Sequence, residues 1–161
     1  MTMGESYDFP RAEVFWPGAD GPPGSRVFFL AGGDAGGLVY LRCEKQQVAA
    51  LGEYLLALLD DLSPDVEPTE GLGAVTPLPY AWNVGSIGVK YDEPEGRIVV
   101  VLEELTDDED DKPATARFCF TLPQAAAFGR FALDLVSKGR PDCGFCGLPI
   151  DPDGHACPRM N

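Results

Sequence analysis

The sequence predicts an α+β fold in which two copies of a βββα unit form a curled antiparallel sheet with two helices, plus a small C-terminal zinc knuckle. Two observations lead to this prediction. A helical segment occurs twice at a spacing of 77 residues, each time after β-rich runs. The last nineteen residues contain three of the five cysteines and the only histidine. The chain of 161 residues is long enough for one compact body with a small appendage.

The repeat is clearest in two segments of twelve residues. "EKQQVAALGEYL" (44–55) matches "TLPQAAAFGRFA" (121–132), with identities at Gln47/Gln124, Ala49/Ala126, Ala50/Ala127 and Gly52/Gly129. Each segment follows three β-rich runs: "VFWPG" (14–18), "RVFFLAGG" (26–33) and "LVYLRC" (38–43) in the first copy, and "YAWNVGSIGVKY" (80–91), "RIVVVLEEL" (97–105) and "ARFCF" (116–120) in the second. We therefore divide the chain into a duplicated body (1–136) and a zinc-binding segment (139–161). Repeat one spans about 12–62, a Pro- and Gly-rich linker spans 63–79, and repeat two spans about 80–138.

Both helices show an apolar stripe. It comprises Val48, Leu51, Leu55, Leu58 and Leu62 in the first helix, and Ala125, Phe128, Ala132 and Leu135 in the second. The second helix also begins with a capping box, in which Thr121 caps and Gln124 reaches back. Two strands, however, are apolar on both faces, "VFFLA" and "IVVVL". A sheet with helices on one side leaves one face open, so we expect a strongly curled or barrel-like sheet, or a dimer packed through its centre.

The net charge of −14 lies in the body, because the basic and acidic residues after residue 136 cancel. Such a field favours cationic partners and repels phosphate backbones, so nucleic acid is disfavoured. No run is long enough for a membrane helix, and the N-terminus lacks the basic and apolar regions of a secretory signal. We expect a cytoplasmic protein without membrane contact.

The C-terminal segment predicts a metal site. Cys143, Cys146, His155 and Cys157 form the pattern C-x2-C-x8-H-x-C, and the turn in "LPIDPDG" returns the chain to the first cysteine pair. Four N and S ligands match a tetrahedral Zn²⁺ site, and four protein ligands leave no open position. The zinc is therefore expected to be structural. The alternative is unmetallated thiols beside a surface histidine.

The zinc site limits enzymatic chemistry, because a metal-bound His155 leaves no histidine as a general base. In the body, Tyr40, Arg42 and Arg117 are predicted on the sheet face opposite the helices. Basic and aromatic residues on a sheet can bind single-stranded nucleic acid, whereas the alternative is that they line a dimer interface or pair with carboxylates. The acidic stretch "EELTDDEDD" (103–111) lacks the spacing of a calcium loop, which favours a solvated hairpin tip.

In these features the chain resembles domain-of-unknown-function family 3090, which is found mainly in actinobacteria. The resemblance rests on "PGSRVFFLAG", "EKQQVAALGEYL", "WNVGSIGVKYD" and above all "KGRPDCGFCGLPIDPDGHACPR". This sequence departs from the family near Trp16–Pro22, where members have a smoother strand-like run. The resemblance implies a cytosolic bacterial protein with a repeat body and a Cys/His tail. It implies no activity.

Three functional hypotheses follow, and the leading one is a non-enzymatic binding or scaffold protein with an acidic docking surface for a basic protein partner or a second copy. The second is a small-ligand binder or carboxylate-based enzyme with a pocket between the repeats, using Glu44, Glu103 or Glu104 with Arg42 or Arg117. The third is single-stranded nucleic-acid binding through Tyr40, Arg42 and Arg117.

Overall fold

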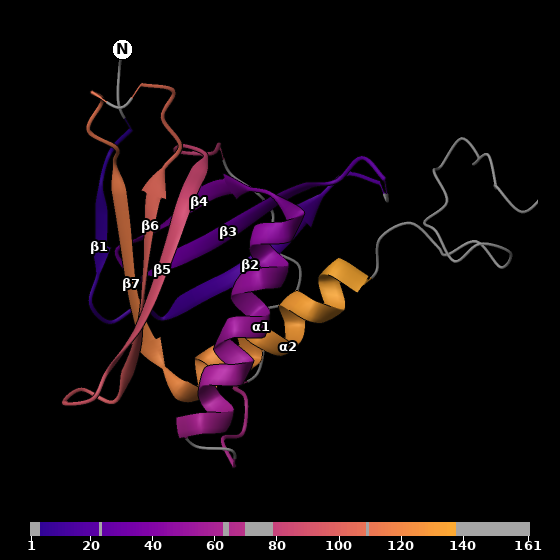
Figure 1. The fold of residues 1–161 in the computed structure, drawn as a ribbon, viewed down its shortest axis with the longest axis vertical. Coiled ribbons are helices and arrows are strands. Elements are labelled where there is room, and N and C mark those ends of the chain that lie inside the picture. The colour runs from indigo at the N-terminus through magenta and orange to yellow at the C-terminus, as the bar shows by residue number, and fades with distance from the viewer. Residues whose placement is uncertain (1–3, 23, 63–64, 70–78, 109, 138–161) are drawn as a thin grey trace, which may run out of the picture.

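A computed structural model describes residues 4–22, 24–62, 65–69, 79–108 and 110–137 of the chain. These residues form an α+β fold of two sheets and two helices (Figure 1). The elements are β1 (Tyr7–Phe9), β2 (Val14–Asp20), β3 (Val27–Asp34), β4 (Gly37–Cys43), α1 (Lys45–Leu62), β5 (Val84–Asp92), β6 (Arg97–Glu104), β7 (Thr115–Thr121) and α2 (Leu122–Ser137). A run of three antiparallel strands and a helix thus occurs twice, as β2–β4 with α1 and as β5–β7 with α2.

The strands form two separate sheets, so the expectation of one curled sheet was wrong. One sheet has the order β1-β7-β6-β5 and the other the order β2-β3-β4. Neither closes into a barrel within the described residues. The physical reason is that consecutive strands of each run pair with one another, so each run forms its own sheet. The tightest connection is the β3–β4 turn, where Gly33 has a φ of 151° and a Cβ there would lie 2.1 Å from the carbonyl of Gly37.

The two runs are nevertheless intertwined. β7 pairs in parallel with β1, which precedes the first strand of the other run. β4 makes a similar parallel contact with the residues just before β5. The Arg42 amide donates to the carbonyl of Trp82 at 3.1 Å, and the Ala81 amide donates to the carbonyl of Tyr40 at 2.8 Å. The sequence did not predict β1, since three residues are too few for a periodic signal. These parallel contacts attach each run to the start of the other.

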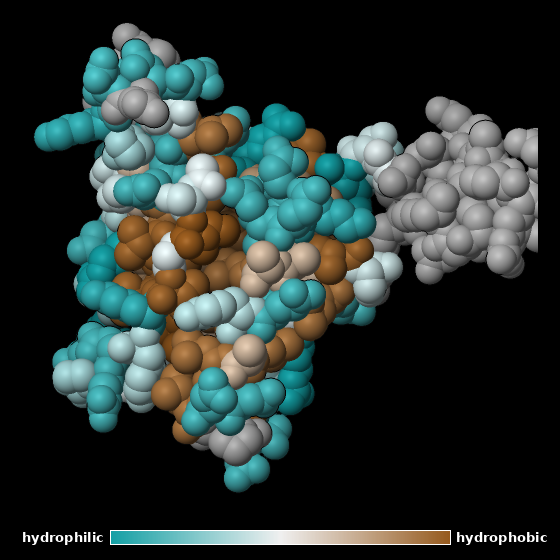
Figure 2. All heavy atoms as spheres, viewed as in Figure 1, coloured by the Kyte–Doolittle hydropathy of each residue, from teal (hydrophilic) through white to brown (hydrophobic). Residues whose placement is uncertain are grey.

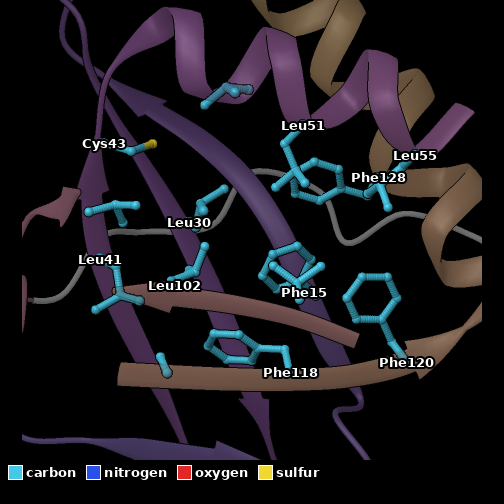
Figure 3. Packing of buried hydrophobic residues seen from close by; sticks show 14 of the residues in the cluster. Phe15, Leu30, Leu41, Cys43, Leu51, Leu55, Leu102, Phe118, Phe120 and Phe128 are labelled. Atoms are coloured by element: carbon cyan, nitrogen blue, oxygen red, sulfur yellow. The ribbon is translucent and has the colours of Figure 1, made fainter. Parts of the chain in front are cut away.

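One hydrophobic core lies between the crossing sheets and under the helices (Figure 3). At its centre the ring of Phe15, from β2, lies 5.1 Å from Phe118, 4.9 Å from Phe120 and 4.9 Å from Phe128. These three partners come from β7 and α2, so a single side chain of the first run joins the strand and helix of the second. Leu30, Leu41, Leu51, Leu55 and Leu102 complete the core around them.

The outer sheet faces explain why two strands are apolar on both sides. On the β2-β3-β4 sheet, Phe29, Ala31 and Tyr40 form a second buried cluster, against which Tyr80 packs. On the other sheet, Val99 and Cys119 are paired and both buried. Charged side chains surround Cys119 closely enough to influence its pKa: Arg117, Asp8, Asp92 and Arg97. Local side chains therefore cover these outer faces, and the fold needs neither a barrel nor a dimer to do so.

The helices begin and cross as the repeated sequence suggests. The capping box of α2 is confirmed: the Thr121 amide donates to Gln124 Oε1 at 2.8 Å, and the Gln124 amide donates to Thr121 Oγ1 at 3.2 Å. In α1 the predicted stripe holds at Val48, Leu51 and Leu55, but Leu59 is buried and Leu62 is exposed. The helices cross at the two matched glycines. A Cβ at Gly52 would lie 3.4 Å from the carbonyl of Gly129, and a Cβ at Gly129 would lie 3.2 Å from that of Gly52.

Candidate functional site: an open groove between helix α1 and strand β5

A groove of about 550 Å³ lies between α1 and β5. It is lined by Gln46, Gln47, Ala50, Leu51, Tyr54, Gly85, Ile87 and Val89. Figure 2 shows hydrophobic surface in the hollow between these two elements. Tyr54 is 53% exposed, so a large aromatic ring borders the groove without being covered. An open apolar groove of this size is typical of a binding surface.

Gln47 sets the position of α1 relative to β5. Its Oε1 accepts a hydrogen bond from the Glu44 amide at 2.7 Å, which caps the helix. Its Nε2 donates to the carbonyls of Val84 and Gly85, each at 3.2 Å. The helix is thus tied to the start of β5, whose inward residues Ile87 and Val89 pack on the core and remain half-exposed.

Both elements that form the groove carry carboxylates beyond its lining. α1 and the β5–β6 hairpin both end at the lower side of Figure 1. The last turn of α1 carries exposed Asp60 and Asp61, and the hairpin carries Asp92, Glu93 and Glu95. The groove lining itself has no charged residue. The site therefore combines an apolar floor with carboxylates beyond it, which suits an apolar side chain flanked by basic ones.

The three predicted surface residues do not form one surface. Tyr40 is only 4% exposed and belongs to the second buried cluster. Arg42 is exposed on the same face of the β2-β3-β4 sheet. Arg117 lies on the outer face of the other sheet, where its guanidinium pairs with Asp8 at 3.0 Å. Since the inner faces of the two sheets share the core, Arg117 points away from the other two residues.

The candidate carboxylates are also dispersed. Glu104 accepts hydrogen bonds from the amides of Gly4 and Ala114, and Glu103 accepts one from the Ser86 hydroxyl at 2.9 Å. Glu44 instead lines a polar pocket of about 270 Å³ with Arg26, Arg42 and Lys45. All residues that line this pocket lie between 24 and 45, within the first run of strands. It is therefore not a pocket between the two halves.

The two described cysteines are poor nucleophiles. Burial, with a smaller contribution from Glu44, raises the pKa of the Cys43 thiol to about 12. Burial is also the main cause that raises the pKa of Cys119. A thiol reacts as its thiolate, so both remain in the unreactive form at neutral pH.

The predicted zinc ligands Cys143, Cys146, His155 and Cys157 lie outside the described residues. Within the described part of the chain, no group of three or more His, Cys, Asp or Glu residues is arranged to hold a metal ion. None of the described helices is long and apolar enough to cross a membrane.

The sequence did not identify the groove. Tyr54 was matched to Phe131 as part of the repeat, and Ile87 and Val89 were assigned only to a strand. A signal is present in β5, where Gly85, Ile87 and Val89 alternate with Ser86, Gly88 and Lys90 on the opposite face. What the alternation does not reveal is that the apolar face stays partly uncovered.

The described residues define an α+β protein with two sheets, a shared core and an open apolar groove between α1 and β5. A family model described as "Protein of unknown function (DUF3090)" matches residues 7–157. Because the match covers most of the chain, the protein belongs to this family, as its sequence motifs predicted. The chain matches no curated protein and no solved structure.

Proposed function

We propose that the chain is a non-enzymatic binding protein that docks a protein partner in the groove between α1 and β5. The observation that carries the proposal is the open apolar groove, with Tyr54 exposed at its rim. Among the residues that line it, only Tyr54 has a titratable side chain. Such a lining favours binding over acid–base or nucleophilic chemistry.

Charge favours a basic partner over a second copy. The chain carries a net charge of −14, and both elements that form the groove carry carboxylates beyond its lining, at Asp60 and Asp61 of α1 and in the β5–β6 hairpin. A second copy would bring the same negative field to the interface, which costs free energy and slows association. A partner with Lys or Arg residues at its docking segment gains from the same field.

A structural zinc ion at Cys143, Cys146, His155 and Cys157 is the second part of the proposal. Three thiolates and one imidazole suit tetrahedral zinc, and this set leaves no position for a substrate. The ion would hold the C-terminal segment in one conformation. Protein purified without chelator should contain about one zinc per chain by elemental analysis, and Cys146→Ser should lose it. Equal zinc in the variant and the parent protein would refute the assignment.

We also regard the two βββα runs as copies of one ancestral unit. The support is that matched residues make matched contacts. Gln47 uses its Nε2 to reach the start of β5, and Gln124 uses its Nε2 to reach the residues just before β2, donating to the carbonyls of Ala12 and Glu13 at 3.1 Å. Gly52 and Gly129 likewise face one another at the helix crossing.

The binding proposal is tested by capture from a native bacterial lysate with the full zinc-loaded chain as bait. We expect a stoichiometric protein partner that is released as salt is raised, because the contact is partly electrostatic. A matched bait with Tyr54→Ala should capture less of it. Recovery of the bait alone at low salt would refute the proposal.

The small-ligand alternative has two supporting observations: the groove between α1 and β5, which lies between the two runs, and the pocket lined by Arg26, Arg42, Glu44 and Lys45. Arg26 is already engaged there, since its guanidinium donates to the Leu135 carbonyl at 3.1 Å and lies 5.1 Å from the centre of the Phe28 ring. Calorimetric titration with small dicarboxylates and phosphate tests this alternative, and Arg42→Ala should abolish any binding that occurs. Single-stranded nucleic-acid binding gains no support, because Tyr40 is buried and Arg117 is turned away.

A further inference from the structure

The molecule has two equivalent grooves, each between a helix and the first strand of the other run. One is the open groove between α1 and β5. The other lies between α2 and β2 and is lined by Glu13, Val14, Phe15, Trp16, Thr69, Gln124 and Ala127. Gln47 and Ala50 of the first match Gln124 and Ala127 of the second at the 77-residue spacing. Their volumes are about 550 Å³ and about 40 Å³, and the smaller groove adjoins a cavity of about 510 Å³ that shares Glu13, Thr69 and Gln124 with it but is not lined by Trp16.

Strand register identifies the residue that closes the smaller groove. In the first run, Trp16 pairs with Ala31, which pairs with Tyr40. In the second run, Gly88 pairs with Val101, which pairs with Arg117. Tyr40 and Arg117 are 77 residues apart and occupy the same place in their runs. Trp16 and Gly88 are therefore structural equivalents.

This difference accounts for the open groove. The indole of Trp16 stacks on Phe131 with ring centres 4.5 Å apart, and Trp16 is only 7% exposed. Tyr54 is the equivalent of Phe131, but Gly88 has no side chain to cover it. The ring of Tyr54 is consequently 53% exposed. One half of the molecule thus supplies its own aromatic plug, and the other half lacks one.

We propose that the missing plug is an aromatic side chain of the partner, carried on an extended segment with flanking Lys or Arg residues. This inference rests on the proposed binding function and specifies its ligand. The aromatic ring stacks on Tyr54 as Trp16 stacks on Phe131. The extended backbone lies along β5, which is the last strand of its sheet and has no further strand beside it within the described residues. The basic residues meet the carboxylates of Asp60, Asp61 and the hairpin.

The probe is the capped peptide acetyl-Lys-Val-Trp-Val-Lys-amide, titrated into the isotope-labelled, zinc-loaded full chain. We expect saturable NMR shifts at the groove residues of α1 and β5, with upfield ring-current shifts of the Tyr54 ring protons. Replacing Trp by Ala in the peptide should weaken binding about tenfold, because the stacked ring and its apolar area are lost. Replacing both Lys residues of the peptide by Glu should weaken peptide binding more at low salt than at high salt.

Gly88→Trp is the decisive variant, with Gly88→Ala as its matched control. A Cβ at Gly88 would contact only the Val101 carbonyl, at 3.9 Å, and the backbone there is not in the left-handed region, so a side chain can start from this position without backbone strain. Gly88 lies on the face of β5 opposite Ile87, as Trp16 lies on the face of β2 opposite Phe15, so the indole of Gly88→Trp should reach round the strand edge and stack on Tyr54 as Trp16 stacks on Phe131. We expect it to weaken peptide binding at least tenfold, while Gly88→Ala binds within about twofold of the parent protein. Thermal denaturation checks that both variants remain folded.

The outcomes separate the inference from the binding function. A peptide that shifts no groove signal, or that binds Gly88→Trp as tightly as Gly88→Ala, overturns the inference. The inference is also overturned if the parent protein is a dimer and Gly88→Trp is a monomer, because the occupant of the groove is then a second copy of the chain. In the lysate capture, a partner held equally by the parent and Gly88→Trp upholds the binding function and overturns the inference. Loss of that partner from Gly88→Trp, together with peptide binding, supports both.

Discussion

Gly52→Ala tests the helix crossing, because two physical effects predict opposite signs. Alanine is a better helix former than glycine, which alone would stabilise α1 by about 1 kcal/mol. The crossing opposes it, since a Cβ at Gly52 would lie 2.9 Å from the Cβ of Ala132. A favourable carbon–carbon contact needs about 3.5 Å or more, so the helices must separate by roughly 0.6 Å. Because a Cβ moves only with its backbone, the strain cannot be relieved by a rotamer change.

We expect the clash to outweigh the propensity gain. Overpacking a buried contact costs about 1–3 kcal/mol, which leaves a net destabilisation of up to about 2 kcal/mol. Urea unfolding followed by circular dichroism, at fixed zinc, measures the change. Ala57→Gly, at an exposed position in the middle of α1, calibrates the propensity term in this helix.

The double variant Gly52→Ala with Ala132→Gly isolates the contact. Once the opposing Cβ is removed, Gly52→Ala should become neutral or stabilising, with a coupling energy of about 1–2 kcal/mol. If Gly52→Ala stabilises the parent protein by as much as Ala57→Gly destabilises it, the two helices do not touch at this glycine and the reasoning is wrong.

Three further predictions concern the core, a cap and a buried thiol. Phe15→Ala should lower the free energy of unfolding by about 3–5 kcal/mol, because it empties the centre of the core. Leu105→Ala, at an exposed position, should leave the free energy of unfolding nearly unchanged. Equal thermal midpoints for these two variants would contradict the shared core. Gln124→Glu keeps the capping acceptor but loses the donor to the carbonyls ahead of β2, so urea unfolding should show a loss of about 1–3 kcal/mol; no loss would mean that this link is not stabilising. The thiol of Cys43 titrates at about 12 when folded and near 8.5–9 when unfolded. The thiol of the unfolded state therefore loses its proton first, and the free energy of unfolding falls as pH rises above about 9. Cys43→Ala should make this fall less steep. If the alkylation rate of Cys43 in the folded protein levels off near pH 9, the raised pKa is refuted.

The α+β class, both helices, six of the seven strands and the family were predictable from sequence. Helical and strand periodicities are local properties, so the stripes in "EKQQVAALGEYL" and "TLPQAAAFGRFA" and the alternation in "RFCFTL" indicated their elements directly. The capping box at Thr121 was legible for the same reason. β1 was missed because a strand of three residues is stabilised by its partner β7 and not by its own pattern. The two-sheet arrangement was missed because the faces of "VFFLA" and "IVVVL" do not reveal what covers them.

The candidate sites also differ in how far the sequence could predict them. The proposed zinc set could be named from sequence, since metal-ligand spacing is itself local. The groove could not, because its two walls are separated by the whole segment between Tyr54 and Gly85. Tyr40 and Arg117 looked equivalent in the repeat, yet one is buried under Tyr80 and the other pairs with Asp8. Exposure of a strand residue depends on segments that pack from elsewhere in the chain.

The sequence by itself thus determined both helices, six of the strands and the family, because the periodicities and motifs that indicate them are local. Only the tertiary structure decided how the two runs intertwine and which groove stays open. Trp16 and Gly88 cannot be aligned by sequence, since at that register β2 and β5 share only Asp20 and Asp92. Their equivalence comes from hydrogen-bond register through β3 and β4 in one run and β6 and β7 in the other. Backbone pairing across three strands places an indole over one helix and nothing over the other.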